Sequence, residues 1–392
     1  MEVIKTNILI FSIMFQRHIF FLCILALSLA GCDRTGPWGN GTGTGPATDT
    51  FSEDLSATLL LRDYRPQSIY HVPKTQVERA MYPVIDMHSH DYAGDDAGVK
   101  RWIANMDRVG IEKSIVMTEA TGQRFDSIMA VYAPYKDRFD VWCSFDYTGY
   151  DEPGFGPAAV AELERCVEQG AKGVGELGDK GKGLFYNRDA PAWGMHSDDP
   201  RMDPLFEKCA ELGLPVNIHI AEPKWMYEPM DSTNDGLMEA LYWQVEKEEG
   251  KLGHDELMTV LWNTLERHPE TTFIACHYAN CTYDLSIIAG MLDRFPNLYL
   301  DISARFFNVA AIPGNAAAFF DEYQDRLCYG TDMGTSEQMY RLTYRILETD
   351  DEHFYGSEYG LDSYHFPVYG LGLSNRVLEK IYRKNALKLS GS

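Results

Sequence analysis

The sequence predicts an α/β fold, a (β/α)8 TIM barrel, and three observations lead to it. Eight short apolar runs recur along the chain, helical patterns lie between them, and polar side chains stand at the ends of several runs. Strands that alternate with helices form a parallel sheet, and eight is the number that closes a barrel. The expected strands are 83–90, 113–119, 139–146, 171–177, 215–221, 271–278, 298–304 and 327–332.

Three of the segments between these runs have clear helical patterns. Residues 96–109 place apolar side chains on one face, 157–169 begins with a proline and is followed by Gly170, and 256–267 repeats leucine and valine at helical spacing. An open doubly wound sheet is the competing topology. No Gly-x-Gly-x-x-Gly follows the first strand, so the barrel is favoured.

The first expected strand ends in an Asp-x-His-x-His cluster, within Pro83-Val84-Ile85-Asp86-Met87-His88-Ser89-His90. Side chains alternate along a strand, so His88 and His90 point the same way and can bind one divalent metal together. The alternative is a pair of core histidines, each hydrogen-bonded to the backbone. The pairing at the end of an apolar strand favours the metal.

Four more strands end in residues that can bind a metal. Glu176 ends the fourth strand, His219 the fifth, His277 the sixth and Asp332 the eighth. The C-terminal ends of the strands are the face where barrel enzymes build their active sites. Five strands that carry such side chains at the same level predict a metal site there.

Composition and charge limit the possible partners. Apolar content of 45% and charged content of 24% are typical of a globular protein. The net charge of −23 argues against nucleic acid and anionic lipid as partners, because both attract basic surfaces. We expect a small-molecule substrate, and a homo-oligomer is compatible with the sequence.

The N-terminus predicts export. Residues 1–31 contain a short basic region and an apolar run too short to span a membrane, as in a signal peptide. Leu29-Ala30-Gly31-Cys32 resembles the bacterial lipobox, which implies a lipidated Cys32. Residues 32–58 include a Gly-, Thr- and Pro-rich tether, and 59–392 is the expected catalytic domain. The protein would then be an exported, membrane-anchored lipoprotein that faces the periplasm or the cell surface, attached to the membrane only through this lipid.

The order His-x-His, Glu, His, His, Asp on strands one, four, five, six and eight resembles the amidohydrolase superfamily of metal-dependent hydrolases. The phrases Ile85–His90, Tyr329–Asp332 and Lys384–Leu389 are similar to its amidohydrolase-related branch. The resemblance runs from about Pro83 to Leu389. It implies the TIM barrel and metal chemistry, and the branch contains hydrolases, lactonases and decarboxylases.

The resemblance also implies the role of each site residue. The metal ligands would be His88, His90, Glu176, His219, His277 and Asp332, and Asp332 and His277 would be catalytic. Zinc is the first candidate for the metal, and manganese, iron or nickel suit the same donors. Many superfamily members bridge two ions with a carboxylated lysine; here Glu176 can bridge, while Lys172 lies too deep. One or two ions therefore remain open, with two favoured.

In the implied reaction, a metal-activated hydroxide attacks the carbonyl of an ester, lactone or amide, or a phosphoester. A non-oxidative decarboxylase is the alternative, and Arg305 supports it because it could bind a substrate carboxylate. A binding protein that has lost catalysis is a third possibility, which the complete ligand set disfavours. Tyr278, Trp225 and Tyr227 are expected to line the pocket, and residues 225–255 to form a lid or an oligomer contact.

Overall fold

The computed structural model describes residues 55–390, except 186–189, 242, 246–248 and 362–364. The chain divides into two compact units, Met1–Thr58 and Leu59–Ser392. Of the first unit only the short helix α1 (Leu55–Thr58) is described, so the expected signal peptide, Cys32 and most of the tether lie outside the described residues. Among the described helices, none has the length and apolar character needed to cross a bilayer.

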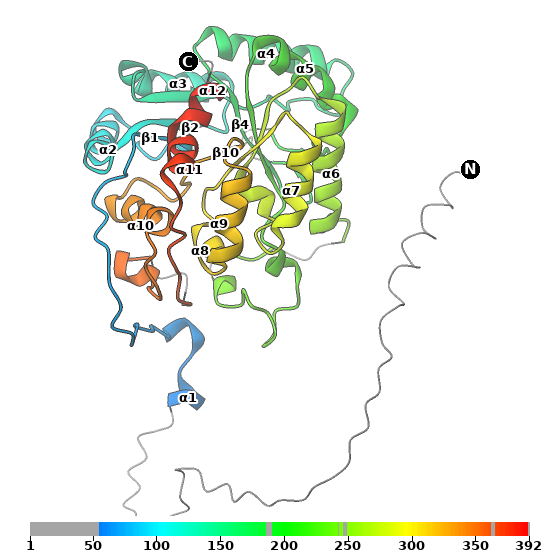
Figure 1. The fold of residues 1–392 in the computed structure, drawn as a ribbon. Helices are drawn as coiled ribbons and strands as arrows, with labels where there is room; N and C mark the ends of the chain where they lie inside the picture. Colours follow the sequence, from blue (N-terminus) through cyan, green and yellow to red (C-terminus); the bar gives the residue numbers. More distant parts are fainter. Residues whose placement is uncertain (1–54, 186–189, 242, 246–248, 362–364, 391–392) are drawn as a thin grey trace, which may run out of the picture. The chain divides into compact units, whose positions relative to one another are not determined.

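Eight parallel strands form the centre of the second unit (Figure 1). They pair in two groups, β1–β2–β3 and β10–β9–β8–β7–β4. Within each group, parallel strands that follow one another along the chain lie side by side. Two short strands, β5 (Gly183–Leu184) and β6 (Ala192–Trp193), extend the second group in antiparallel pairing beyond β4. The parallel strands are β1 Val84–His90, β2 Ile111–Met117, β3 Phe139–Trp142, β4 Val174–Asp179, β7 Val216–Ile220, β8 Phe273–Ala275, β9 Leu298–Asp301 and β10 Leu327–Cys328.

A few backbone hydrogen bonds connect the two groups of strands on each side. On one side Cys143 pairs in parallel with Val174, just beyond the end of β3. On the other side the amide of Met87 donates to the carbonyl of Tyr329, at 2.9 Å, and the amide of Asp332 donates to the carbonyl of His88, at 2.9 Å. These bonds join β1 to the segment after β10, so the predicted α/β barrel is confirmed.

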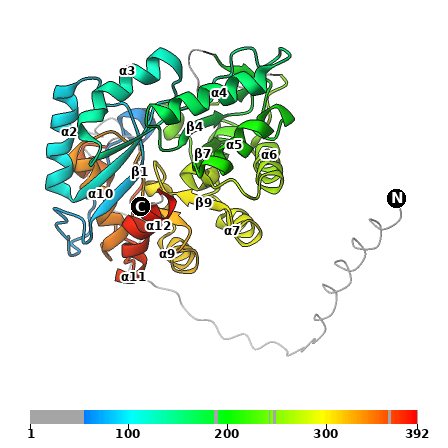
Figure 2. The ribbon, with the colours of Figure 1, turned by 90° about the horizontal axis from the view of Figure 1, so that it is seen from above.

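Helices surround the strands, as the view from above shows (Figure 2). The expected helix 96–109 is observed with those bounds; the Asp95 side chain accepts a hydrogen bond from Gly98 N at its start, as an N-cap does. The helices are α2 Asp96–Val109, α3 Gly122–Tyr132, α4 Phe155–Glu168, α5 Asp203–Leu212, α6 His254–Arg267, α7 Leu285–Arg294, α8 Phe306–Ala310, α9 Pro313–Glu322, α10 Glu337–Glu348, α11 Asn375–Glu379 and α12 Asn385–Leu389.

A small apolar cluster lies beneath the site and closes the barrel from the other end. Ile85 and Met87 of β1 pack there with residues of five other strands and with Ala386 of α12. Asn385 donates to the carbonyl of Leu327, at 2.7 Å, which holds α12 against the start of β10. Apolar side chains therefore fill the barrel interior beneath the C-terminal ends of the strands.

Several strands are shorter than the sequence predicts, and two of them end before a candidate site residue. The expected strand 271–278 ends at Ala275, and the expected strand 327–332 ends at Cys328. After each of these two strands the backbone turns at the candidate site residue, because His277 (φ 58°) and Asp332 (φ 51°) adopt the left-handed conformation. Apolar patterning could not reveal these turns, since a few apolar residues look the same in a strand and in the turn that follows it.

Candidate functional site

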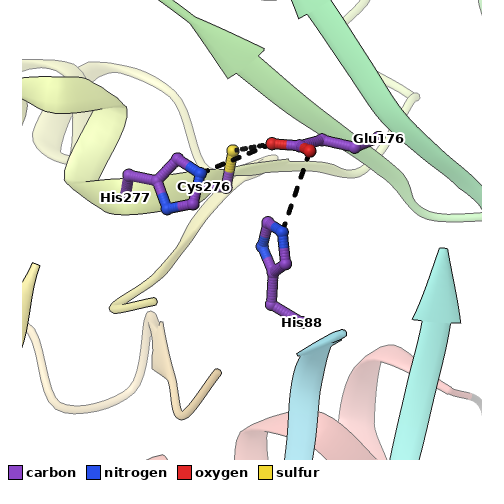
Figure 3. Close-up of side chains that lie close together, drawn as sticks. All are labelled: His88, Glu176, Cys276 and His277. Carbon is purple, nitrogen blue, oxygen red and sulfur yellow. Dashed lines mark hydrogen bonds and ion pairs between the residues drawn. The ribbon is translucent and has the colours of Figure 1, made fainter. Parts of the chain in front are cut away.

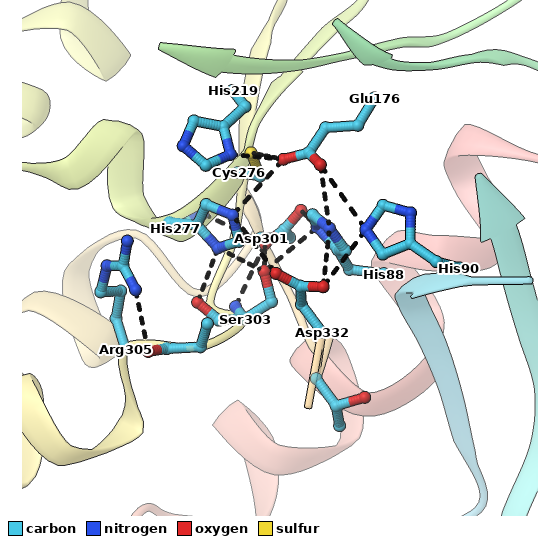
Figure 4. Close-up of polar contacts among 12 residues, drawn as sticks. His88, His90, Glu176, His219, Cys276, His277, Asp301, Ser303, Arg305 and Asp332 are labelled. Atoms are coloured by element: carbon cyan, nitrogen blue, oxygen red, sulfur yellow. Dashed lines mark hydrogen bonds and ion pairs between the residues drawn. The ribbon is translucent and has the colours of Figure 1, made fainter. Parts of the chain in front are cut away.

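The ends of several strands bring the predicted site residues together (Figures 3 and 4). His88 and His90 come from β1, Glu176 from β4 and His219 from β7. His277 follows β8, and Asp332 follows β10. Every predicted metal ligand thus lies in one cluster at the C-terminal end of the barrel.

Three imidazoles are held in the same way. The Nδ1 atom of His90 lies 3.1 Å from the carbonyl of Met117, and that of His277 lies 2.9 Å from the carbonyl of Ser303. The Nδ1 atom of His88 lies 2.9 Å from Asp301 Oδ2. A carbonyl or a carboxylate only accepts, so we assign the proton to Nδ1 in each ring. The lone pair on each Nε2 is then available to a cation.

Asp301 and Ser303 orient these rings from below. Asp301 is fully buried; its Oδ2 also accepts from Asn217 Nδ2, at 2.9 Å, and its Oδ1 accepts from the His277 amide, at 3.2 Å. The Ser303 hydroxyl bonds Asp301 and lies 3.1 Å from His88 Nδ1 and 2.8 Å from His277 Nδ1. The buried Asp301 carboxylate therefore holds the His88 ring directly and the His277 ring through Ser303.

The Nε2 atoms face two carboxylates. His88 Nε2 lies 3.9 Å from Glu176 Oε2 and 3.8 Å from Asp332 Oδ1, and His90 Nε2 lies 3.6 and 3.2 Å from the same two oxygens. Ligands at zinc distances in a tetrahedron are separated by roughly 3.3–3.6 Å. His88 Nε2 is buried and has no hydrogen-bond partner among the described residues. His88, His90 and Asp332 thus form a group of three donors close enough to hold one divalent cation, and Glu176 Oε2 lies within 3.9 Å of both imidazole Nε2 atoms.

The electrostatics of the cluster also call for positive charge. Burial opposes protonation of His88, but Asp301, Asp332 and Glu176 outweigh it and raise its pKa to about 10. Burial likewise favours the neutral form of Glu176, yet His219 and His88 hold its pKa well below the ordinary value. The carboxylates are thus ionised and gain from a cation between them.

His277 forms the other side of the cluster. Its Nε2 lies 3.4 Å from Glu176 Oε1 and 3.7 Å from Asp332 Oδ2. Burial lowers the pKa of His277, so its ring is neutral at neutral pH. Each carboxylate therefore turns one oxygen to the β1 histidines and the other to His277.

His219 and Cys276 contact Glu176 from behind. His219 Nδ1 lies 2.6 Å from Glu176 Oε1, which is a hydrogen-bond distance, and its Nε2 lies 3.7 Å from Glu222 Oε1. The Cys276 thiol donates to Glu176 Oε1 at 3.1 Å. In this arrangement both side chains hold Glu176 in place.

The turn that carries Asp332 is fixed by β1. The buried carboxyl of Asp86 accepts from the Thr331 amide, at 3.0 Å, and from the Thr331 hydroxyl, at 2.7 Å. Gly330 packs against His88 so closely that a Cβ on it would lie 2.8 Å from His88 Cβ. Asp86 of the Asp-x-His-x-His sequence and Gly330 of the Tyr-Gly-Thr-Asp sequence thus hold these two segments against each other.

A cavity of about 620 Å³ opens above the cluster. Arg305 lines it, as expected from the sequence, and lies 3.5 Å from Glu222 Oε2 while it donates to Asn280 Oδ1 at 2.6 Å. Trp225 also lines it. Tyr227, expected beside it, does not line the cavity; its hydroxyl accepts a hydrogen bond from the Glu222 amide. Residues 225–255 supply part of this wall, through η4 (Lys224–Tyr227) and η5 (Glu239–Leu241).

The expectation for Tyr278 needs correction. Its side chain is fully buried and does not line the cavity; the ring packs near Phe319 and Phe320 of α9. The physical reason is the left-handed turn from His277 to Asn280, which directs His277 to the site and Tyr278 to the core. Proximity in sequence to His277 was the only basis for the prediction.

Several residues of the site were missed from the sequence. Asp301 stands at the end of β9 and carried the same signal as Asp332, but only Arg305 was singled out after that strand. Glu119, two residues after β2, lies 3.5 Å from His90 Nδ1, and Tyr92 donates to Asp332 at 3.2 Å. Cys276 and Glu239 gave no pattern at all. Lys172 is exposed just before β4, which agrees with its exclusion from the site.

Comparisons with known proteins concern the whole barrel. No curated protein matches the sequence. Among solved structures, a 2,6-dihydroxybenzoate decarboxylase from Rhizobium is 16% identical over 79% of this chain and 99% of its own, with a TM-score of 0.47. A 5-carboxyvanillate decarboxylase from Novosphingobium aromaticivorans, complexed with manganese, is 17% identical over 82% and 100%, with a TM-score of 0.48.

A third structure is a 4-oxalomesaconate hydratase from Rhodopseudomonas palustris, 14% identical over 79% of this chain and 95% of its own, with a TM-score of 0.45. The family model described as Amidohydrolase matches residues 71–391, which include all eight strands and every residue of the cluster. The chain therefore belongs to the amidohydrolase family and is a metal-dependent enzyme of the amidohydrolase superfamily.

Proposed function

We propose that the protein is a metal-dependent hydrolase that acts on the carbonyl of a small-molecule ester, lactone or amide. The observation that carries the proposal is the placement of Asp332. One of its oxygens lies among the donors of His88, His90 and Glu176, and the other lies beside His277 at the floor of the cavity. A single carboxylate can thus serve both the cation and the proton transfer.

The cation would be held by His88, His90, Glu176 and Asp332. Imidazole and carboxylate donors suit zinc, and manganese, iron or nickel also accept them. When bound, a divalent cation lowers the pKa of water and polarises a carbonyl. We propose one tightly held ion, because His219, expected as a ligand of a second ion, belongs to no group of three or more donors close enough to hold a cation among the described residues.

Asp332 and His277 would handle the protons. Burial raises the pKa of Asp332, but His88 and His90 outweigh it, so the carboxylate is ionised and can accept a proton. The neutral His277 presents an unprotonated Nε2 3.7 Å away. Hydrolysis needs a group that takes a proton from water and returns one to the leaving group, and this pair fits both steps.

A metal-dependent decarboxylase is the second candidate, and the position of Arg305 in the cavity favours it. Its guanidinium would bind a substrate carboxylate. However, Glu222 already lies 3.5 Å from Arg305 and forms an ion pair with Lys180, so both cationic side chains of the cavity wall have an anionic partner. We therefore rank hydrolysis first.

An activity panel on the full-length chain distinguishes the two. We expect the metal-loaded protein to hydrolyse at least one neutral ester, lactone or amide, and a chelator to abolish turnover. A phosphoester in the same panel tests the other class of hydrolytic substrate. Release of carbon dioxide from aromatic carboxylates, with no hydrolysis of any carbonyl substrate, would establish the decarboxylase instead.

We also propose that the protein is exported and anchored through Cys32. The support is the sequence Leu29-Ala30-Gly31-Cys32 after an apolar run. Expressed in a bacterium, the chain should incorporate labelled fatty acid and partition with membranes. Cys32→Ser should lose the label and keep the barrel folded, whereas equal labelling of the variant would exclude this cysteine.

A further inference from the structure

The outer half of the cavity contains a carboxyl group that the proposed reaction does not use. Glu239 of η5 lines the cavity and is only 7% exposed. Its Oε1 atom has no hydrogen-bond partner, and no Lys, Arg or His side chain forms an ion pair with Glu239 among the residues that the structure describes. A buried acid without a cationic partner is costly, so its position calls for an explanation.

The cationic side chains nearby are engaged elsewhere. Lys180 and Arg305, the two that line the cavity, both contact Glu222. Burial raises the pKa of Glu239 to about 7, against smaller opposing effects of Arg305 and the Trp225 indole. Glu239 therefore gains from any positive charge that enters the cavity.

The charge of the whole cavity points the same way. Five carboxyl groups and two cationic side chains line it: Glu119, Glu176, Glu222, Glu239, Asp332, Lys180 and Arg305. With all five carboxyl groups ionised, a divalent cation adds two positive charges and still leaves one negative charge in excess. An anionic ligand is disfavoured there, and a cationic one is favoured.

Aromatic rings surround the same region. Trp225 and Trp243 line the cavity from the segment that carries Glu239, and Phe307 lines it from α8. Trp225 is held in place, because it packs on Gly236, where a Cβ would lie 2.1 Å from the indole, and Asn234 donates to its carbonyl at 3.0 Å. Aromatic rings beside a carboxylate are a combination that binds ammonium groups.

We propose that the substrate carries a protonated amino group, which binds against Glu239 and the Trp225 ring while its carbonyl lies at the metal end. The inference rests on the proposed hydrolase function and names its substrate class: amino esters, amino lactones or amino amides. Glu239 would recognise the substrate and take no part in bond cleavage.

Calorimetry on the metal-loaded, full-length chain tests the recognition without turnover. The probes are n-butylammonium, n-butanol and butyrate, which share a chain length and differ in charge. We expect n-butylammonium to bind at least about tenfold more tightly than the other two. Preferential binding of butyrate, or equal binding of all three, would overturn the proposal, and this arm needs no variant.

Variants then locate the interaction. Glu239→Gln should weaken n-butylammonium binding about tenfold or more, Glu239→Asp should keep part of it, and the exposed Glu228→Gln on the same segment should match the wild type. Unchanged affinity in Glu239→Gln would remove Glu239 from the site. Ammonium binding without hydrolysis would count against the hydrolase alone, and hydrolysis of neutral carbonyls without ammonium preference would count against the amino group alone.

Discussion

The inner and outer halves of the cavity are built in different ways. The inner half consists of side chains at the ends of strands, each fixed by a second polar partner, as His88 is by Asp301 and Asp332 by its turn on Asp86. The outer half is formed by short turns between β7 and α6, with aromatic rings and the buried carboxyl of Glu239. The difference separates chemistry from recognition: strands hold the reacting groups, and loops choose the substrate.

The largest effect is expected in the inner half, at Asp332. Asp332→Asn keeps the shape and one oxygen for the cation but cannot accept a proton, so turnover should fall by about 10²–10⁴. Metal content, measured by elemental analysis, should remain close to that of the wild type. The exposed Asp137→Asn at the other end of the barrel serves as control. Near-normal turnover of a metal-loaded Asp332→Asn protein would transfer the proton role to His277.

The next effect concerns stability and arises in the outer half. The pKa of Glu239 is raised from 4.5 to about 7 by burial, so the folded state binds this proton more tightly than the unfolded state does. High pH therefore destabilises the fold: burial of the protonated group has no such effect below about pH 4.5, and about 3 kcal/mol is lost progressively as the pH rises from 4.5 through 7. Glu239→Gln should remove that loss.

Thermal unfolding at pH 5.5 and pH 8 measures the loss of stability that the ionisation of Glu239 causes. The wild type should lose more stability between the two pH values than Glu239→Gln does, in the absence of any ligand. A parallel pH dependence in both proteins would mean that Glu239 is ionised and paired, and the contrast between the two halves would weaken.

A smaller effect is expected for the buried support of the inner half. Asp301→Asn should weaken metal binding by about 10–100-fold, because the His88 ring loses the carboxylate that orients it. Competition with a chelator gives the dissociation constant. Wild-type affinity in this variant would show that the histidines need no such support and that the inner half is less preorganised than the contacts indicate.

The smallest effect is expected at Lys172. This side chain is exposed before β4, far from the level of Glu176, so Lys172→Met should leave metal content and turnover within twofold of the wild type. A loss of metal in Lys172→Met would contradict the assignment of the β4 carboxylate to Glu176.

The site residues of the inner half were predicted from the sequence, because they stand at regular positions along or just after the strands. His88 and His90 alternate along a strand, and Glu176, His219, His277 and Asp332 each follow an apolar run, so the spacing alone indicates their level in the barrel. The direction of individual side chains in the turns after the strands could not be predicted. Tyr278 looked like a wall residue, but the left-handed turn after His277 directs it into the core.

The outer half could not be predicted from periodicity. Trp225 and Glu239 are fourteen positions apart in a segment without a regular pattern, and they meet because the chain turns on Gly236 and Asn234. The burial of the Glu239 carboxyl without a cationic partner arises only in the folded chain, and no spacing in the sequence predicts it. Asp301 is an intermediate case, since its place at a strand end was visible and its role as a support was not.

Metal stoichiometry of the full-length chain tests the proposed donor set most directly. After purification without chelator and exhaustive dialysis, we expect close to one divalent ion per chain, held by His88, His90, Glu176 and Asp332. His90→Ala should lose that ion while the fold is retained, and the exposed Lys172→Met should keep it. A wild-type chain that retains no ion, or a His90→Ala variant that retains the ion with unchanged affinity, would contradict the assignment of these four side chains.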